Sequence, residues 1–70
     1  MPFKFKQYDI LRIIHSDEPI EGLYYKLFMV EKESRMKDGN IYLVSNKSNE
    51  NEVYWINEEY LEYVPLHEYY

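Results

Sequence analysis

The chain contains no cysteine, no alanine and no threonine, and only two glycines and three prolines among its 70 residues. Without cysteine, the protein can have no disulfide bond, no thiolate ligand for zinc and no cysteine nucleophile. The absence of alanine disfavours a helical bundle, which relies on strong helix formers. No apolar run is long enough to span a bilayer, and the N-terminus lacks the apolar stretch of a secretory signal. We therefore expect a cytoplasmic protein with no membrane association.

Aromatic residues are what the chain has in abundance, with nine tyrosines, three phenylalanines and one tryptophan. Each aromatic side chain can bury roughly 150–250 Å², so these residues can build a core in a chain too short for a purely aliphatic one. Tyrosine, isoleucine, phenylalanine and tryptophan also favour strands over helices. The length suffices for one small domain, and we predict that residues 1–70 form a single all-β domain.

Five segments have the apolar and β-branched composition that is typical of strands. They are residues 8–15, 23–34, 41–45, 52–56 and 61–64. The dipeptide Asp38-Gly39 between two of them is a strong hairpin signal. A polar loop is predicted over residues 16–22, which contain proline and glycine. We expect Trp55 and Leu61 to lie in the core.

The remaining connections are short and polar. Residues 46–51 are predicted to form a loop or an exposed hairpin tip. Asn57 is expected to cap a single helical turn over residues 58–61, because acids follow it where the helix dipole favours them. The first seven and the last four residues are interpreted as tails, which leaves a core of about residues 8–64.

Two stretches of the chain resemble SH3-like small barrels. Tyr8-Asp9-Ile10-Leu11 is similar to their opening strand, in which an acidic residue precedes core aliphatics. Residues 55–62 (WINEEYLE) are similar to their closing strand, 3-10 turn and final strand. The resemblance implies a five-stranded barrel with one short helical turn before the last strand. It carries over no activity, since the chain lacks the basic glycine-containing loop of KOW-type domains. It also lacks the ALYDY-type segment and the Pro-Tyr pair of peptide-binding SH3 domains.

Signals for catalysis or metal binding are weak. Both glycines stand alone, so no phosphate-binding loop is present, and no serine has the context of a nucleophile elbow. His15 and His67 could pair with Asp17 or Glu68, but surface histidines are the simpler interpretation. We predict that the protein is not an enzyme and uses no cofactor and no metal. An enzyme or metal protein that uses His15 and nearby acids is the alternative.

Charge is distributed unevenly along the chain. Residues 1–47 carry seven acids and eight bases, whereas residues 48–70 carry six acids and no lysine or arginine. Tyrosines alternate with these acids and offer apolar surface that suits arginine stacking. We predict a face that binds a protein with a basic surface. It would consist of Glu50, Glu52, Glu58, Glu59, Tyr60, Glu62 and Tyr63.

The spacing of the acids suggests a more specific hypothesis. Alternate residues on a strand lie about 6.7 Å apart, which resembles the separation of successive phosphates, and Glu50 and Glu52 have this spacing. The row could imitate a nucleic-acid backbone; the alternative is that the acids keep a tyrosine-rich protein in solution. Direct binding of nucleic acid is disfavoured because it needs clustered cations, and Lys4 and Lys6 are too few.

These observations favour a non-catalytic protein-interaction module. Residues with AT-rich codons far outnumber those with GC-rich codons. Together with the small size and acidity, this suggests a phage- or mobile-element-encoded inhibitor that acts in the host cytoplasm. It would occlude a basic surface of a host protein, such as one that binds nucleic acid. The alternative function is a self-associating structural or accessory module in which Tyr60 and Tyr63 line a homodimer face.

Overall fold

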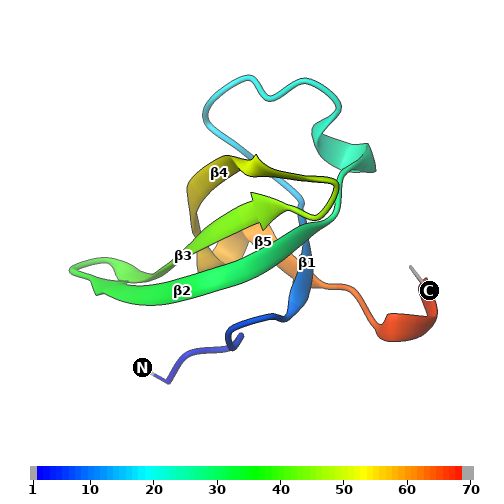
Figure 1. Ribbon diagram of the computed structural model, residues 1–70. Helices are drawn as coiled ribbons and strands as arrows, with labels where there is room; N and C mark the ends of the chain where they lie inside the picture. The colour runs from blue at the N-terminus through cyan, green and yellow to red at the C-terminus, as the bar shows by residue number, and fades with distance from the viewer. Residues whose placement is uncertain (1, 69–70) are drawn as a thin grey trace.

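The computed structural model describes residues 2–68, which form five strands and three 3-10 turns (Figure 1). The strands are β1 (Ile10–Ile13), β2 (Phe28–Met36), β3 (Gly39–Asn46), β4 (Asn49–Asn57) and β5 (Leu61–Tyr63). The turns are η1 (Leu23–Tyr25), η2 (Glu58–Tyr60) and η3 (Leu66–Glu68). The predicted all-β class is therefore confirmed, as is a single helical turn directly before β5.

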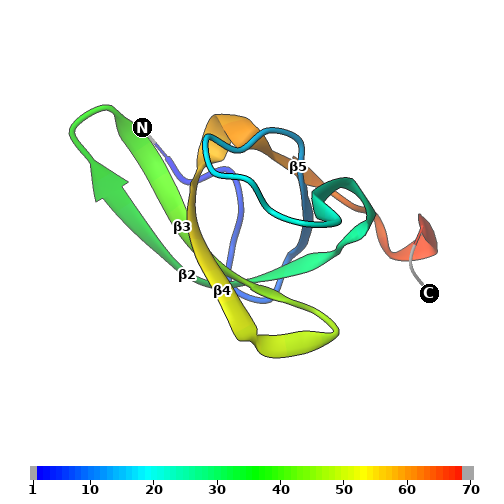
Figure 2. The ribbon, with the colours of Figure 1, turned by 90° about the horizontal axis from the view of Figure 1, so that it is seen from above.

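The strands form one antiparallel sheet in the order β4-β3-β2-β1-β5. β4 and β5 are its edges, and within residues 2–68 they do not pair with each other, so the sheet is open and does not close into the predicted barrel. Viewed from above, the sheet curls strongly (Figure 2). A register shift between Val30 and Lys32 interrupts the long β2, and such irregularities increase the local twist of a strand.

The core fills the inner side of this curled sheet. Its buried members come from every strand, from η1 and from the N-terminal segment, and they are Phe5, Leu11, Ile13, Leu23, Phe28, Val30, Tyr42, Val44, Ile56 and Leu61. The expectation that Leu61 is core is confirmed, but the one for Trp55 is wrong, because its side chain is 48% exposed. Side chains alternate between the two faces of a strand. Since Ile56 points inward, Trp55 must point outward.

The strand predicted over residues 23–34 begins only at Phe28. Gly22 has a left-handed backbone with φ 69°, and the amide of Tyr25 donates to its carbonyl at 3.0 Å. The chain therefore turns in η1 instead of extending. Only Leu23 of this turn is buried. The predicted strand start is wrong because Tyr24 and Tyr25 are exposed, and a tyrosine ring does not require burial.

The N-terminal segment is not the tail that was predicted for residues 1–7. Phe5 is only 4% exposed, and Phe3 packs against the core. The amides of Lys4 and Phe5 donate to the Tyr42 hydroxyl at 3.0 and 3.1 Å. Alternation of phenylalanine and lysine in this segment was the available signal, because it gives one apolar and one polar face.

Both hairpin turns lie where they were predicted. Gly39, with φ 139°, follows the turn between β2 and β3, and residues 47–48 form the tip between β3 and β4. Asn57 precedes η2 as expected, but its side chain makes no capping hydrogen bond. Of the predicted C-terminal tail, residues 67 and 68 are exposed in η3, and residues 69–70 lie outside the described residues, as residue 1 does.

Candidate functional site

Two of the predicted binding residues, Glu52 and Glu58, are engaged inside the molecule. Their partners include the asparagines at the two ends of the inward-facing row of β3. Asn46 belongs to the Glu52 end, and Asn40 belongs to the Glu58 end. Each carboxylate therefore accepts hydrogen bonds that hold the fold together.

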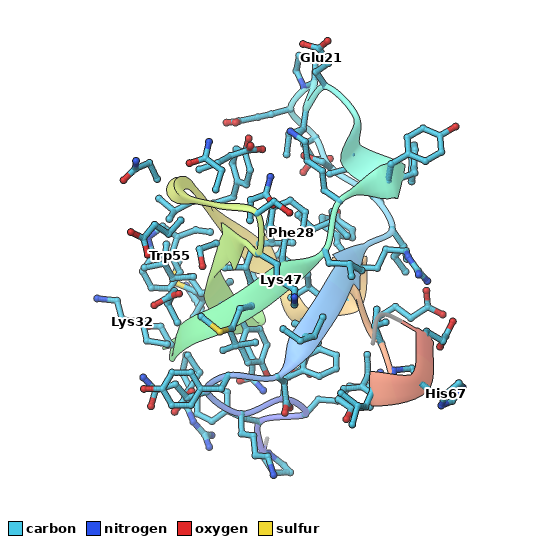
Figure 3. All side chains as sticks on the ribbon, turned by 45° about the vertical axis from the view of Figure 1, so that its right-hand side comes forward. Glu21, Phe28, Lys32, Lys47, Trp55 and His67 are labelled. Carbon is cyan, nitrogen blue, oxygen red and sulfur yellow. The ribbon has the colours of Figure 1, made fainter. Side chains whose placement is uncertain are left out.

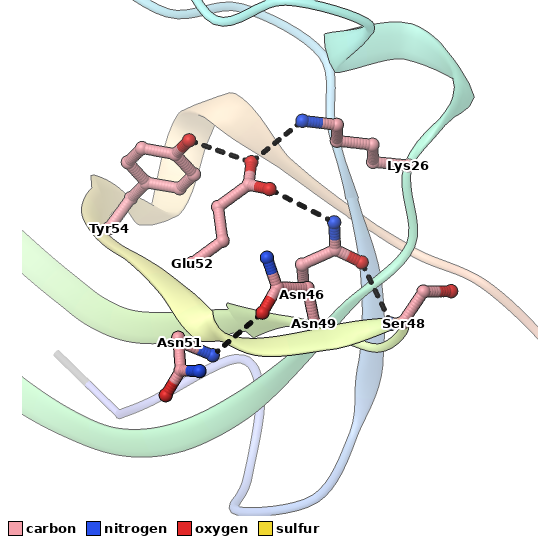
Figure 4. Close-up of polar contacts among 7 residues, drawn as sticks. All are labelled: Lys26, Asn46, Ser48, Asn49, Asn51, Glu52 and Tyr54. Carbon is pink, nitrogen blue, oxygen red and sulfur yellow. Dashed lines mark hydrogen bonds and ion pairs between the residues drawn. The ribbon is translucent and has the colours of Figure 1, made fainter.

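At the first end, Glu52 accepts three side-chain hydrogen bonds (Figure 4). Lys26 Nζ lies 2.8 Å and the Tyr54 hydroxyl 2.7 Å from Oε2, and Asn46 Nδ2 lies 3.2 Å from Oε1. The Lys26 contact, followed by the Tyr54 and Asn46 bonds, lowers the pKa of Glu52 to about 2. The charge of Glu52 is thus matched within the protein by the ammonium group of Lys26.

At the second end, Glu58 Oε2 accepts three bonds from groups that carry no charge. The donors are the Tyr42 hydroxyl at 2.5 Å, the Lys4 amide at 3.0 Å and Asn40 Nδ2 at 3.1 Å. Burial opposes ionisation of this carboxyl, but these donors, together with the charge of Lys4, outweigh it and lower the pKa of Glu58. Burial and the bond to Glu58 raise the pKa of Tyr42 to about 12. Glu58 therefore fastens the N-terminal segment to the sheet.

The other predicted residues lie near the surface. Glu62 Oε2 is 3.7 Å from Arg12 Nη1 on the neighbouring strand. Tyr63 is 53% exposed. The half-buried Tyr60 packs its ring edge-to-face with His15 at a centroid distance of 4.8 Å. The predicted set thus includes one exposed ring and one exposed ion pair that can face a partner.

Glu50 and Glu59 are exposed, and their side chains make no hydrogen bond or ion pair with another described residue. Glu50 lies near the start of β4, whereas Glu59 follows the end of the strand. At about 3.3 Å per residue, the strand between them spans roughly 20–25 Å. These two acids are therefore too far apart to contact one cationic group.

A groove that the sequence did not reveal lies between the loop after β1 and the last residues of β4. Its volume is about 420 Å³. We name it the β4 groove, and it is lined by Ser16, Asp17, Glu18, Ile20, Val53, Tyr54, Trp55, Ile56, Asn57 and Tyr60. The lining includes two carboxylates and no lysine or arginine, so the groove is acidic.

The walls of the β4 groove combine this charge with apolar and aromatic surface. Val53 and Trp55 are 46% and 48% exposed. Lys32 lies over the Trp55 ring at 5.6 Å from its centroid, on the outer side of the sheet (Figure 3). The hydrogen bond to Glu52, burial and the charges of Glu52 and Glu18 raise the pKa of Tyr54. Glu18 and Tyr54 both line the groove.

The contact between His15 Nε2 and Asp17 Oδ1, at 3.4 Å, joins two exposed side chains. It leaves Asp17 accessible to a partner. In the sequence, the acids around Pro19 were visible, but we interpreted them as an ordinary polar loop. No sequence signal placed this loop beside β4, because the contact joins segments more than thirty residues apart.

Compared with known proteins, the chain matches no family model, no curated protein and no solved structure. Within the part of the chain that the structure describes, no group of three or more histidine, aspartate or glutamate side chains could hold a metal ion. No helix in residues 2–68 is long and apolar enough to cross a membrane. The geometry of the surface is therefore the basis for a functional proposal.

Proposed function

We propose that the protein is a non-catalytic interaction module built on an SH3-like small barrel. The strand order β4-β3-β2-β1-β5, the 3-10 turn directly before β5 and the irregularity in the long β2 support this fold. A fold of this kind does not specify a function by itself, so the partner is inferred from the β4 groove.

The partner we propose is a protein that presents cationic side chains to the β4 groove. The observation that carries this proposal is an acidic groove with an aromatic wall and no cation in its lining. A guanidinium group can pair with Asp17 or Glu18. The exposed Glu50 and Glu59 add negative charge that attracts a basic partner over longer distances.

The proposed consequence of binding is occlusion of the partner's basic surface. A phage- or mobile-element-encoded inhibitor of a host protein is the biological setting that the composition favours, and a nucleic-acid-binding surface is the target that the acidity suits. In this proposal the groove supplies specificity, and the exposed acids of the C-terminal third supply attraction.

The proposal can be tested with intrinsic fluorescence, because Trp55 is the single tryptophan and lines the groove. We expect a change in its emission on titration with a capped hexapeptide in which arginine and valine alternate. The double variant Asp17→Asn/Glu18→Gln should weaken binding by roughly tenfold or more, since each charge-assisted bond contributes on the order of 1.5–3 kcal/mol.

The matched control is Glu50→Gln/Glu59→Gln, which removes two charges outside the groove. Its affinity should stay within about threefold of the parent protein at moderate salt, where distant charges are largely screened. If this control weakens binding as much as the groove variant, the partner binds the acidic C-terminal surface and our assignment of the groove is wrong. If the affinity does not fall as the salt concentration rises, electrostatic attraction is contradicted both for the groove and for the acidic C-terminal surface.

A second candidate function is self-association, which the exposed ring of Tyr63 on the edge strand β5 favours. In this alternative the protein is an accessory module with a tyrosine-lined homodimer face. Light scattering at several protein concentrations separates the two candidates. A monomer at every concentration rejects self-association, whereas a dimer that Tyr63→Ser dissociates would support it.

A further inference from the structure

The β4 groove has an unusual lining, because five consecutive residues of one strand, Val53–Asn57, contribute to it. Successive side chains on a strand point to opposite faces of the sheet. No single face can therefore present all five residues. What they share is the edge of the strand, so the groove runs along the open edge of β4.

This edge has no backbone partner within residues 2–68. Among the described residues, β4 pairs as a strand only with β3, and no backbone hydrogen bond from a loop residue reaches Val53–Asn57. Alternate amide and carbonyl groups of this stretch consequently point away from the sheet without a backbone partner. An unpaired row of this kind is a template for another strand.

The opposite wall of the groove is the loop after β1, which both ribbon views place beside β4 (Figures 1 and 2). This loop contributes Asp17, Glu18 and Ile20 to the lining. The groove thus has a wall of unpaired backbone and a wall that carries two carboxylates and an apolar side chain. Both walls match features of a single extended, basic chain segment.

We propose that the β4 groove binds an extended segment of the partner as an added strand. Its main chain forms hydrogen bonds to the edge of Val53–Asn57, and its cationic side chains reach Asp17 and Glu18. Recognition of this kind takes affinity from the backbone and specificity from alternate side chains. The inference rests on the proposed function and adds the conformation of the bound segment.

The geometry also sets the pattern of the segment. Five strand residues extend over roughly 13–17 Å, which fits a segment of about four to six residues. Every second side chain of an added strand points to the same face, so a cation at alternate positions meets the acidic loop. The recognised pattern is therefore a cationic residue at every second position, with apolar residues between.

Charge complementarity favours a partner protein over a second copy of this chain. Residues 48–70 contain no lysine or arginine. Pairing two β4 edges would bring Asp17 and Glu18 of both copies together, and neither strand would supply a counter-charge. A separate basic segment supplies that charge, so it is the occupant to which we assign the groove.

The test compares two backbone-methylated versions of the arginine–valine hexapeptide. One version carries N-methyl groups on its arginine residues, the other on its valine residues, and both keep every side chain. In a strand, the amides of alternate residues point to the same side, so only one version loses the bonds to β4. We expect that version to bind on the order of tenfold more weakly, or worse, while the other keeps the parent affinity.

The outcomes separate this inference from the proposed function. Equal affinities of the two methylated peptides, whether both high or both low, would overturn strand addition even if the parent peptide binds. Failure of the parent peptide to bind would overturn the proposed function itself. A peptide of the same composition with its arginines and valines in separate blocks is the control for pattern, and it should bind more weakly than the alternating peptide.

Discussion

The two ends of the core use similar residues to different effect. At each end an asparagine of β3, a tyrosine and a lysine donate to one glutamate. Asn46 and Glu52 mark one end, and Asn40 and Glu58 mark the other. The two sets form polar networks at opposite ends of the inward-facing row of β3. Each network supplies the hydrogen-bond partners that a buried asparagine needs.

The difference lies in how lysine takes part. Lys26 donates a hydrogen bond to Glu52 from its ammonium group, whereas Lys4 bonds Glu58 through its backbone amide and its charge acts on Glu58 without an ion pair between them. The first end is therefore an ion pair that cancels charge. The second end is a set of neutral donors that ties the N-terminal segment to the sheet. Residue type alone does not determine the role of a carboxylate, because the donor atoms decide it.

The largest effect is expected from the N-terminal segment, which is bonded to the Glu58 end. Phe5→Ala removes a buried ring that also packs edge-to-face on Tyr42 at a centroid distance of 5.4 Å. We expect a loss of about 3 kcal/mol or more in the free energy of unfolding, measured by urea denaturation.

Two further variants keep this prediction testable. Phe5→Leu retains most of the side-chain volume, and its free energy of unfolding should fall by roughly half as much. This variant therefore tests the burial of Phe5 even if Phe5→Ala fails to fold. Tyr25→Ala, at a ring that is 94% exposed, should change stability by less than about 0.5 kcal/mol. If Phe5→Leu leaves the free energy of unfolding unchanged, the N-terminal segment does not contribute to the core and is a tail.

Removal of one hydroxyl at each end should give the next largest effect. Tyr42→Phe leaves the buried Phe5 amide and the Glu58 carboxylate without a shared partner, and we expect a cost of about 2–3 kcal/mol. Tyr54→Phe should cost about 1 kcal/mol or less, because Lys26 and Asn46 still hold Glu52. Equal denaturation midpoints for the two variants would remove the distinction between the ends.

The two lysines allow a direct comparison of side chain against backbone. Lys26→Met deletes the ion pair to the partly buried Glu52 and should cost about 1 kcal/mol. Lys4→Met keeps the backbone amide that Glu58 accepts and should stay within about 0.5 kcal/mol of the parent protein. Thermal or urea unfolding of both variants measures the two losses of stability. A larger loss for Lys4→Met than for Lys26→Met would contradict the proposed roles of the two lysines.

The last comparison concerns pH. The pKa of Glu52 is about 2 in the folded protein against an ordinary 4.5, so its contribution to stability is complete above pH 4.5 and is lost as the pH falls toward 2. The pKa of Tyr42 is about 12 against 10, so its contribution is complete below pH 10 and is lost as the pH rises toward 12.

Each end contributes to both arms of the pH profile, because the pKa of Tyr54 is also raised by Glu52 and that of Glu58 is also lowered by Tyr42. Glu52→Gln should flatten the acid arm more than the alkaline arm, and Tyr42→Phe should flatten the alkaline arm more than the acid arm. Urea midpoints measured from acid to alkaline pH provide the check. The acid arm of Glu52→Gln should keep a residual slope from Glu58, whose pKa is also lowered.

Much of the sheet could be predicted because local signals agree with it. The dipeptide Asp38-Gly39 and the apolar segments on both sides of it predicted the β2–β3 hairpin, whose turn is formed by residues 37–38. Trp55 was assigned to the wrong face because both faces of its strand carry apolar residues, and only contacts with β3 decide which one is inside. Tyrosine adds to this ambiguity, since its ring is equally suited to the core and to a wet surface.

The candidate site was less accessible from the sequence. The acids of the C-terminal third are adjacent in the chain, but Glu52 and Glu58 bond inward through donors that are distant in sequence. The β4 groove joins residues 16–20 to residues 53–57, and that proximity arises only when the sheet curls. A sequence pattern reports local spacing and cannot report such a contact.

The most direct test of the account is amide hydrogen exchange in β4, measured by NMR with and without the alternating arginine–valine hexapeptide. Strand addition predicts that alternate amides within Val53–Asn57 gain protection when the peptide binds, while the amides already bonded to β3 change little. If Trp55 fluorescence reports a bound peptide and no amide of Val53–Asn57 becomes protected, the edge of β4 is not the binding surface.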